Sequence, residues 1–304
     1  MMDSNDAVAA VCRRVCDYDH SLESVIVQRK QEAIDAGDES AANLLWCYEA
    51  IYRLKLCYLS AFRHMKLALS SPVTIGEGET ESQKAILYER AWKDLISCEQ
   101  LANALARNYA IEGSTFGDYD VGIIVSDVER LQALFPYRFF FSRDSVVKRA
   151  ECSICGTEFS IRHPCGHIPG RVYCGRLCQR IITKMELGAI SIVTNPHDKE
   201  CICKVPGKSF DYSLLDDVVS HIEPYAKWSC VEERRLLPQY QGLDKGSTCP
   251  CGSGMPIEEC LRENEATHYG KHLNFVLGKG CNLDGVGQLT SSSLCGEPSV
   301  DCNR

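Results

Sequence analysis

The sequence predicts an α+β protein in which an N-terminal α-helical bundle is followed by small zinc-stabilised modules. Three observations lead to this prediction. Apolar residues recur at helical spacing through about the first 135 residues, the chain then becomes dense in Cys, Gly and Pro, and 19 of its 304 residues are cysteine. We expect a helical domain, a first zinc module, a helical linker region, a second cysteine-rich module and a disordered tail, at 1–136, 137–204, 205–246, 247–277 and 278–304.

The N-terminal helices are expected at 21–36, 39–70, 81–111 and 126–135. Asp38 precedes the second helix and can cap its N-terminus, and Pro72 prevents its continuation. Two long helices joined by a loop of roughly ten residues suggest an antiparallel hairpin within a bundle. Cys47, Cys57 and Cys98 lie within these helical patterns, and we interpret them as small buried core residues.

The charge distribution and the use of cysteine indicate which cellular compartment and which kinds of partner the protein is expected to have. The formal net charge is −8, yet residues 143–184 hold eight Lys/Arg against three Asp/Glu. The N-terminal segment has no basic stretch followed by an apolar one, and no run of about 18 apolar residues occurs anywhere. We therefore expect a cytoplasmic protein with no membrane span, whose clustered cysteines bind metal or stay reduced.

The central stretch 151–196 carries the first candidate metal site. Cys152 and Cys155 form C-x-x-C followed by Gly156, a turn in which two thiolates can meet one Zn²⁺. Cys165 and His167 offer a second pair ten residues later, and the intervening TEFSIRHP is long enough for a returning strand. The spacing therefore predicts a tetrahedral Cys₃His zinc site.

The ligand set of this site has alternatives within reach, namely His163, Cys174 and Cys178. A treble-clef arrangement would place Cys178 on a helix formed by RLCQRIITKM and recruit it as a ligand. The pattern C-x-x-C-G followed by C-x-H-x-x-G-x-x-Y-x-G-x-x-C resembles a zinc element of tailed-phage head-maturation proteins and some uncharacterised bacterial proteins. The matching residues are Cys152, Cys155, Gly156, Cys165, His167, Gly170, Tyr173, Gly175 and Cys178. The resemblance implies that ELGAISIVTNP is a strand that closes the module, and no protease features accompany it.

The site is expected to be structural. A catalytic zinc keeps an open coordination position and needs a neighbouring acid or base, whereas thiolates fill the coordination here. The chain has no H-E-x-x-H, P-loop or G-x-S-x-G motif, so an enzyme is the less favoured interpretation. A hydrolase or nuclease with an unrecognised site stays open as an alternative.

The basic residues around the central site suggest a second alternative, a nucleic-acid-binding zinc protein. Aromatic residues lie close to these cations in sequence, as in a nucleic-acid platform. The candidate contacts are Arg171, Arg176, Arg180 and Lys184.

The second cysteine-rich module begins with CPCGSG and ends its pattern at Cys260, with Cys249 and Cys251 as its first pair. It resembles the SEC-C motif, a short zinc-binding hook that occurs at the C-terminus of the translocation ATPase SecA and binds partner proteins. The position after the third cysteine is usually His or Cys, and here it is Leu261. His268 and His272 are the nearest replacements, and His268 completes our expected ligand set.

Together these patterns favour a zinc-binding adaptor or regulatory protein with two Zn²⁺ sites, acting through protein–protein interaction. The resemblances imply a bacterial setting and suggest antiviral defence or phage–host conflict. Nothing in the sequence names the partner protein or the oligomeric state.

Overall fold

The computed structural model describes residues 21–72, 82–108, 119–205, 208–263 and 268–278, and the account that follows is confined to them. The chain divides into two compact units, Met1–Leu215 and Asp216–Arg304. Helices come first and small antiparallel sheets of two strands follow, so the predicted α+β class is confirmed. The predicted disordered tail and the end of the third expected helix lie outside the described residues.

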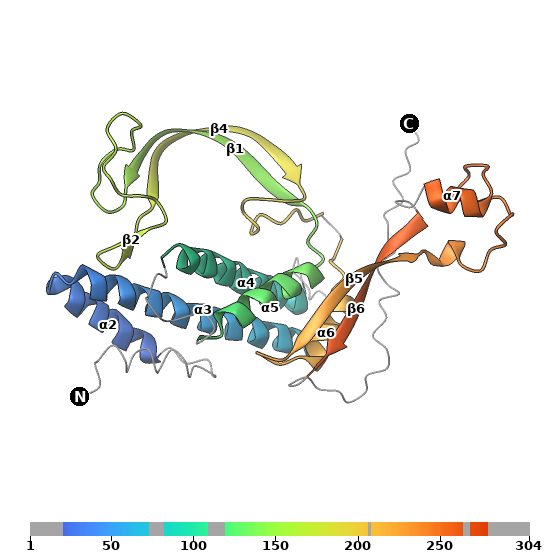
Figure 1. The fold of residues 1–304 in the computed structure, drawn as a ribbon, viewed down its shortest axis with the longest axis horizontal. Coiled ribbons are helices and arrows are strands. Elements are labelled where there is room, and N and C mark those ends of the chain that lie inside the picture. Colours follow the sequence, from blue (N-terminus) through green and yellow to red (C-terminus); the bar gives the residue numbers. More distant parts are fainter. Residues whose placement is uncertain (1–20, 73–81, 109–118, 206–207, 264–267, 279–304) are drawn as a thin grey trace. The chain divides into compact units, whose positions relative to one another are not determined.

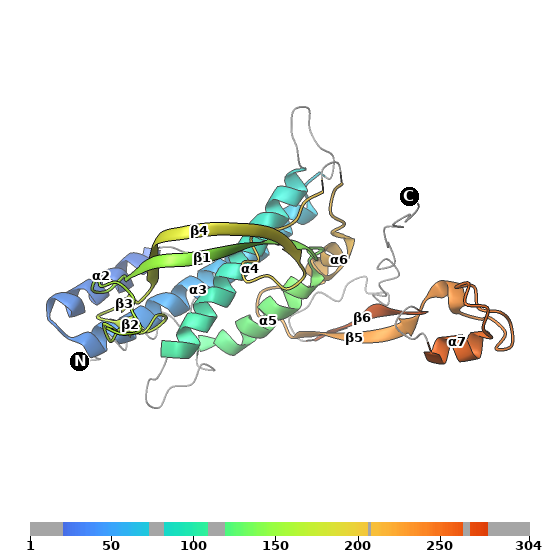
Figure 2. The ribbon, with the colours of Figure 1, turned by 90° about the horizontal axis from the view of Figure 1, so that it is seen from above.

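The first unit is built on four helices, coloured blue to green in Figure 1. These are α2 (Ser21–Asp35), α3 (Glu39–Leu69), α4 (Gln83–Asn108) and α5 (Val121–Leu134). Figures 1 and 2 show α3 and α4 lying side by side. The Asp38 side chain accepts a hydrogen bond from the backbone N–H of Ala41 at 2.9 Å, as the predicted cap requires.

The core of this unit is rich in aromatic side chains. Tyr52, Tyr58, Phe62 and Tyr88 are almost completely buried, and full burial of a side chain of this size stabilises the fold by about 1.5–3 kcal/mol. Cys47 and Cys98 are buried and Cys57 is half-buried, so these thiols do belong to the helical core.

The fourth helix begins earlier than expected, at Val121 instead of 126. The β-branched run VGIIV does not suggest a helix by itself. Val121 and Ile124 are buried, and this packing outweighs the weak local preference for helix. Further along α5, the completely buried Asp127 accepts hydrogen bonds from the Tyr58 hydroxyl and from Arg130.

A long two-stranded ribbon follows the helices. It pairs β1 (Phe140–Cys152) antiparallel with β4 (Arg180–Val193). Figure 1 shows it arching above the helices of the first unit. Between the two strands lie the short β2 (Val172–Tyr173) and β3 (Arg176–Leu177), which pair with each other.

The ribbon corrects two expectations. The stretch RLCQRIITKM does not form a helix, because it supplies β3 and the start of β4, where β-branched residues pair with β1. TEFSIRHP does not form a returning strand; its backbone pairing with β1 is limited to one isolated bridge between Glu158 and Glu151. ELGAISIVTNP does contribute to a strand, as the resemblance implied, although β4 begins earlier, at Arg180.

The second unit contains a hairpin with the second cysteine-rich module inserted into it. Its strands are β5 (Trp228–Leu236) and β6 (Tyr269–Leu277), which pair antiparallel. The insertion includes η2 (Pro238–Tyr240) and α7 (Ile257–Glu263). The helix α6 (Ser213–His221) precedes the hairpin.

The expected helical linker is therefore only partly helical. Residues 228–236 form a strand, because β6 supplies a backbone partner from further along the chain that a local sequence pattern cannot reveal. None of the helices within the described residues combines the length and the apolar content needed to span a membrane.

Candidate metal centres

The central candidate site is formed where β1 ends. Cys152 is the last residue of this strand, and the backbone N–H of Gly156 donates to its carbonyl oxygen at 2.8 Å, closing a tight turn around Cys155. Gly156 has a φ of +71°, a conformation that glycine adopts without steric cost. The turn brings both thiols to one side of the chain.

Cys165 and His167 join these thiols from the loop before β2. The ligand atoms of Cys152, Cys155, Cys165 and His167 all lie within 4.8 Å of one another. A zinc tetrahedron with Zn–S bonds of about 2.3 Å has edges of roughly 3.8 Å, so the four groups can surround one ion. The structure thus brings together the four residues that the spacing predicted.

The surroundings of this site favour a bound metal. Nδ1 of His167 is buried and has no hydrogen-bond partner among the described residues, and a metal ion would satisfy such a nitrogen. Burial raises the pKa of Cys152, but the backbone N–H groups of Cys155 and Ile154 outweigh it and lower the pKa to about 7. The hydroxyl and backbone of Thr157 lower the pKa of Cys155. Lower pKa values favour the thiolates that zinc requires.

The three alternative ligands lie outside the group of four. Cys178 is buried with its Sγ atom 3.8 Å from that of Cys152, and burial raises its pKa to about 11. It lies beside the group of four and outside it. Cys174 and His163 are exposed and do not belong to the group.

The second candidate site lies in the segment between β5 and β6, which we call the hook and define as residues 247–268. The backbone N–H of Cys249 donates to Met255 at 2.8 Å, and Thr248 forms a β-bridge with Pro256. Gly252 and Gly254 both have a positive φ, so glycine is what permits the tight turn after Cys251.

His268 completes this second group. The ligand atoms of Cys249, Cys251, Cys260 and His268 lie within 4.8 Å of one another. The His268 Nε2 atom is 3.2 Å from the Sγ of Cys249 and 3.5 Å from that of Cys260. Cys251 and Cys260 have their sulfurs 3.4 Å apart. The geometry therefore fits a second Cys₃His site.

The position of His268 is set by the hairpin. The helix α7, which contains Cys260, ends at Glu263, and β6 begins at Tyr269. The carbonyl oxygen of His268 accepts a hydrogen bond from the backbone N–H of Leu237 at 2.9 Å. His272 instead lies within β6, where its backbone is paired with Glu233.

Leu261 has a packing role in the hook. Cys249, Ile257 and Cys260 form a buried cluster, and Leu261 packs against it together with Tyr240 and Met255. The Tyr240 ring also lies 4.4 Å from the ring of His268. The residue that directly follows Cys260 therefore contributes to packing and offers no ligand atom.

The two thiols of the first hook pair differ in acidity. Burial raises the pKa of Cys249 to about 11, whereas hydrogen bonds from the Ser253 hydroxyl and backbone lower that of Cys251 to about 6. At neutral pH, Cys251 is therefore the thiol of this pair that is already ionised. A metal ion would deprotonate the other thiol on binding.

The two groups can each hold a metal ion, as expected for two zinc sites. Three sulfurs and one imidazole complete a four-coordinate zinc, which is the composition of structural sites. A metal ion bound to either group of ligands would hold together the loops that carry them.

The predicted nucleic-acid contacts are scattered over the central module. Arg171 donates to the backbone carbonyl of Arg107, and Arg180 lies over the Phe159 ring at 5.4 Å from its centroid. Arg176 and Lys184 are exposed on β3 and β4. Two of the four cations thus have contacts within the protein, and nucleic-acid binding stays a prediction.

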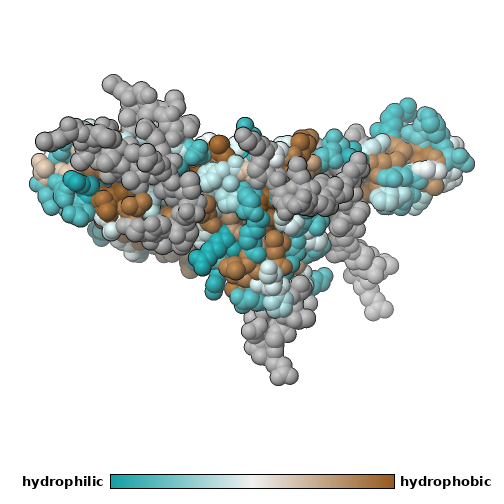
Figure 3. All heavy atoms as spheres, turned by 90° about the horizontal axis from the view of Figure 1, so that it is seen from below, coloured by the Kyte–Doolittle hydropathy of each residue, from teal (hydrophilic) through white to brown (hydrophobic). Residues whose placement is uncertain are grey.

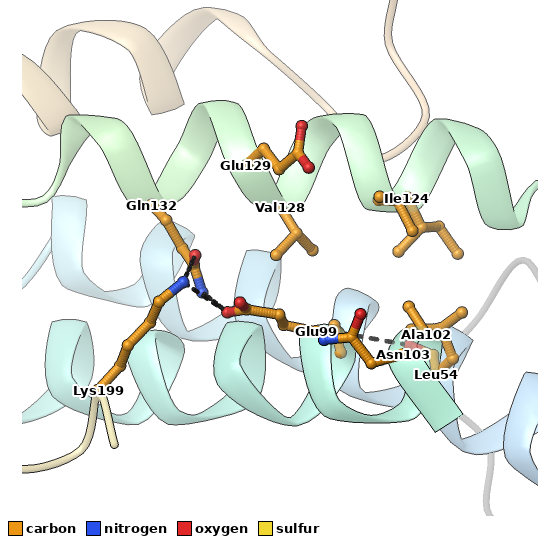
Figure 4. Close-up of a pocket in the computed structure, with 11 residues that line it drawn as sticks. Leu54, Glu99, Ala102, Asn103, Ile124, Val128, Glu129, Gln132 and Lys199 are labelled. Carbon is orange, nitrogen blue, oxygen red and sulfur yellow. Dashed lines mark hydrogen bonds and ion pairs between the residues drawn. The ribbon is translucent and has the colours of Figure 1, made fainter. Parts of the chain in front are cut away.

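A cleft between α4 and α5 is separate from both metal sites. Its volume is about 260 Å³, and Leu54, Cys98 and Val128 contribute to its lining. Figure 4 shows Lys199 at one end, where its ammonium lies 2.6 Å from Glu99 and 2.9 Å from Gln132. The ammonium, carboxylate and amide groups of these three residues satisfy one another.

On the face drawn in Figure 3, apolar side chains lie in separate patches among hydrophilic ones.

Comparison of the chain with protein-family models, with curated proteins and with solved structures finds no match.

Proposed function

We propose that this protein is a zinc-stabilised adaptor or regulatory protein that binds a partner protein through its hook. The observation that carries the proposal is the hook's group of three cysteines and one histidine, which leaves zinc no open position for chemistry. A metal held in this way fixes the shape of a surface. The resemblance of CPCGSG to the SEC-C motif supports the same function.

An open groove beside the hook supplies a surface for a partner. Its volume is about 610 Å³, and it lies entirely within the second unit. Tyr240, Leu243, Ile257 and Leu261 provide apolar lining. Tyr240 also contacts His268, so metal binding and groove shape are connected through one pair of rings. Apolar grooves with charged rims are common protein-docking surfaces.

The charged rim contributes to selectivity. Lys245 and Arg262 line the groove together with Glu258, and the Lys245 ammonium lies 3.4 Å from the Glu258 carboxylate. This pair is highly exposed, so it contributes little to stability. Charged groups at such a rim act mainly on the rate and specificity of association.

Capture from a lysate of the source organism tests the proposal. A photo-crosslinker is placed in the full chain at Arg262, an exposed residue that lines the groove, and crosslinked proteins are quantified by mass spectrometry. Leu243→Glu should lower the yield of a specific partner about tenfold. Val231→Glu is the matched control, because Val231 is an exposed apolar residue of β5 outside the groove lining.

One result of the capture experiment with these two variants would contradict the proposal. If Leu243→Glu and Val231→Glu capture the same proteins at the same yield, the groove is not the docking surface. A partner lost from both the His268→Ala and the Leu243→Glu variants would link the metal site to docking.

The setting that we propose is the bacterial cytoplasm, in regulation or in phage–host conflict. This part of the proposal depends on the resemblances of the two cysteine-rich modules, with matching residues from Cys152 to Cys178 and from Cys249 to Cys260.

A further inference from the structure

The β1–β4 ribbon leaves an unusual amount of apolar surface exposed. Every residue of β4 except its last is exposed, and the side chains of Met185 and Ile190 are 48% and 69% exposed. Ile181, Ile182, Leu187 and Ile192 are also exposed. Among the described strands, β1 and β4 pair only with each other. Two-stranded ribbons are marginally stable in water, so a surface of this kind calls for a partner.

The two edges of the ribbon differ in how well they are protected against pairing. β1 contains five charged residues, Arg143, Asp144, Lys148, Arg149 and Glu151, and charged side chains are one way in which natural edge strands discourage association. β4 has no charged residue from Leu187 to its end. β4 is therefore the edge that is open to another strand.

The charges that β4 does have are self-complementary. Lys184 and Glu186 lie on either side of Met185, two residues apart and hence on one face of the strand. In an antiparallel pair of β4 strands with a two-fold axis at Met185, each lysine is directly opposite the glutamate of the second copy. Opposite charges in such cross-strand positions are favourable.

We propose that two copies of this chain associate by pairing their β4 strands antiparallel about Met185, which joins the two ribbons into a four-stranded sheet. A symmetric interface requires a self-complementary surface, and the Lys184–Glu186 arrangement provides one. A strand from an unrelated protein would not require this symmetry.

The register on Met185 is favoured over its main competitor. Centring the axis on Thr183 would also bring opposite charges together, namely Arg180 and Glu186. However, Thr183 lies at an irregularity of the ribbon, because β1 pairs Arg149 with Lys184 and the next residue with Ile182. Thr183 therefore has no partner in β1, whereas Met185 pairs with Val147 and the pairing continues in register through Glu186 to Leu187; on the other side of Met185 a second irregularity separates Val147 from Arg149.

The same register satisfies both faces of the new sheet. On one face, Glu186 would lie between Lys184 of the second copy and its own Lys148, whose ammonium is already 3.0 Å from its carboxylate. On the other face, Met185 would lie opposite its symmetry mate. Apolar surface is thereby removed from water, which drives association.

A charge exchange measured by sedimentation velocity tests this interface. The zinc-loaded full chain should form a dimer at micromolar concentration. Lys184→Glu and Glu186→Lys should each weaken the dimer roughly tenfold, because each places like charges opposite each other twice. The double variant Lys184→Glu/Glu186→Lys should restore wild-type dimerisation, because it exchanges the charges and keeps the complementarity.

Arg162→Glu serves as the control, since it reverses an exposed charge outside the ribbon. Zinc content and circular dichroism establish that each variant is folded. A wild-type chain that stays monomeric at about 100 μM contradicts the proposal. So does a dimer that both single reversals leave intact, or one that the double variant fails to restore.

Discussion

His268 shows how one residue completes a site that the preceding sequence leaves open. The three hook cysteines lie within twelve residues, and their local spacing was sufficient to predict them as ligands. The histidine is different, because the return of the chain through β6 brings it to the cysteines. Sequence reasoning nominated His268 as the replacement ligand in preference to His272, but the strand pairing that brings it to the cysteines is non-local and could not be predicted.

Substitution of His268 should empty the hook. Without its imidazole, three thiolates remain and zinc binds more weakly. We expect His268→Ala to reduce the metal content from about two zinc ions per chain to about one, measured by elemental analysis. His272→Ala is the matched control and should retain both ions. Loss of zinc from His272→Ala and not from His268→Ala would reverse the assignment.

The thiols of the helical core should behave unlike those of the metal groups. Burial raises the pKa of Cys47 and of Cys57 to about 11, and that of Cys98 well above its ordinary value. At pH 8 these thiols stay protonated, and only the thiolate reacts with an alkylating agent.

These differences in pKa predict which cysteines are alkylated at pH 8 once a chelator has removed the metal. After removal of metal, iodoacetamide should label Cys155 and Cys251, whose pKa values are lowered, within minutes. Cys98 should stay unlabelled until the protein unfolds. Peptide mass spectrometry measures both, and rapid labelling of Cys98 in the folded protein would contradict the burial of that thiol.

At the scale of elements, the helices were predictable and the ribbon only in part. Helical periodicity and capping residues such as Asp38 are local signals, and α2 and α3 match their expected bounds within one residue. The end of β4 lies in ELGAISIVTNP, which was expected to be a strand, whereas its beginning lies in RLCQRIITKM, which was expected to be a helix. The pairing of β4 with β1 is non-local, so the ribbon as a whole could not be predicted from local patterns.

Asn108 connects these elements, because it joins the end of α4 to the loop that precedes β2. Its side chain donates to the carbonyl oxygen of Gly170 at 2.7 Å and accepts from the backbone N–H of Val172 at 2.9 Å. On the other side of β2, the backbone N–H of Gly175 donates to Asn43 at 2.8 Å. These contacts attach the central module to the bundle.

Asn108→Ala should loosen this attachment. Loss of these two hydrogen bonds, together with the one that the Asn108 side chain donates to the carbonyl oxygen of Ala104, costs about 1–3 kcal/mol in the free energy of unfolding of the first unit. Hydrogen exchange at the amides of Val172 and Gly175 should accelerate accordingly. Asn103→Ala is the control, because Asn103 is an exposed residue of the same helix. Equal exchange in both variants would show that Asn108 does not hold the module.

At the scale of the whole molecule, each compact unit contains one of the two metal-ligand groups. The central group lies in Met1–Leu215 and the hook in Asp216–Arg304. Changes in composition predicted five regions along the chain. They did not reveal that the hook is an insertion within a hairpin, because this follows from the pairing of β5 with β6. Separate units predict that the two sites bind metal independently.

Loss of one site should therefore leave the other intact. Cys155→Ser should remove the central zinc and lower the thermal stability of the first unit, because a structural zinc contributes directly to folding free energy. The hook should keep its metal and its resistance to proteolysis at 237–263. Simultaneous loss of both ions from this single variant would show that the two sites depend on each other.

The stoichiometry of zinc in the intact chain tests the central claim most directly. Native mass spectrometry of the full-length protein should show one dominant species with two zinc ions, one for each group of four ligands. A double variant, His167→Ala/His268→Ala, should lose most of this metal. A wild-type chain that binds one zinc ion or none, or a double variant that keeps both, would contradict the account.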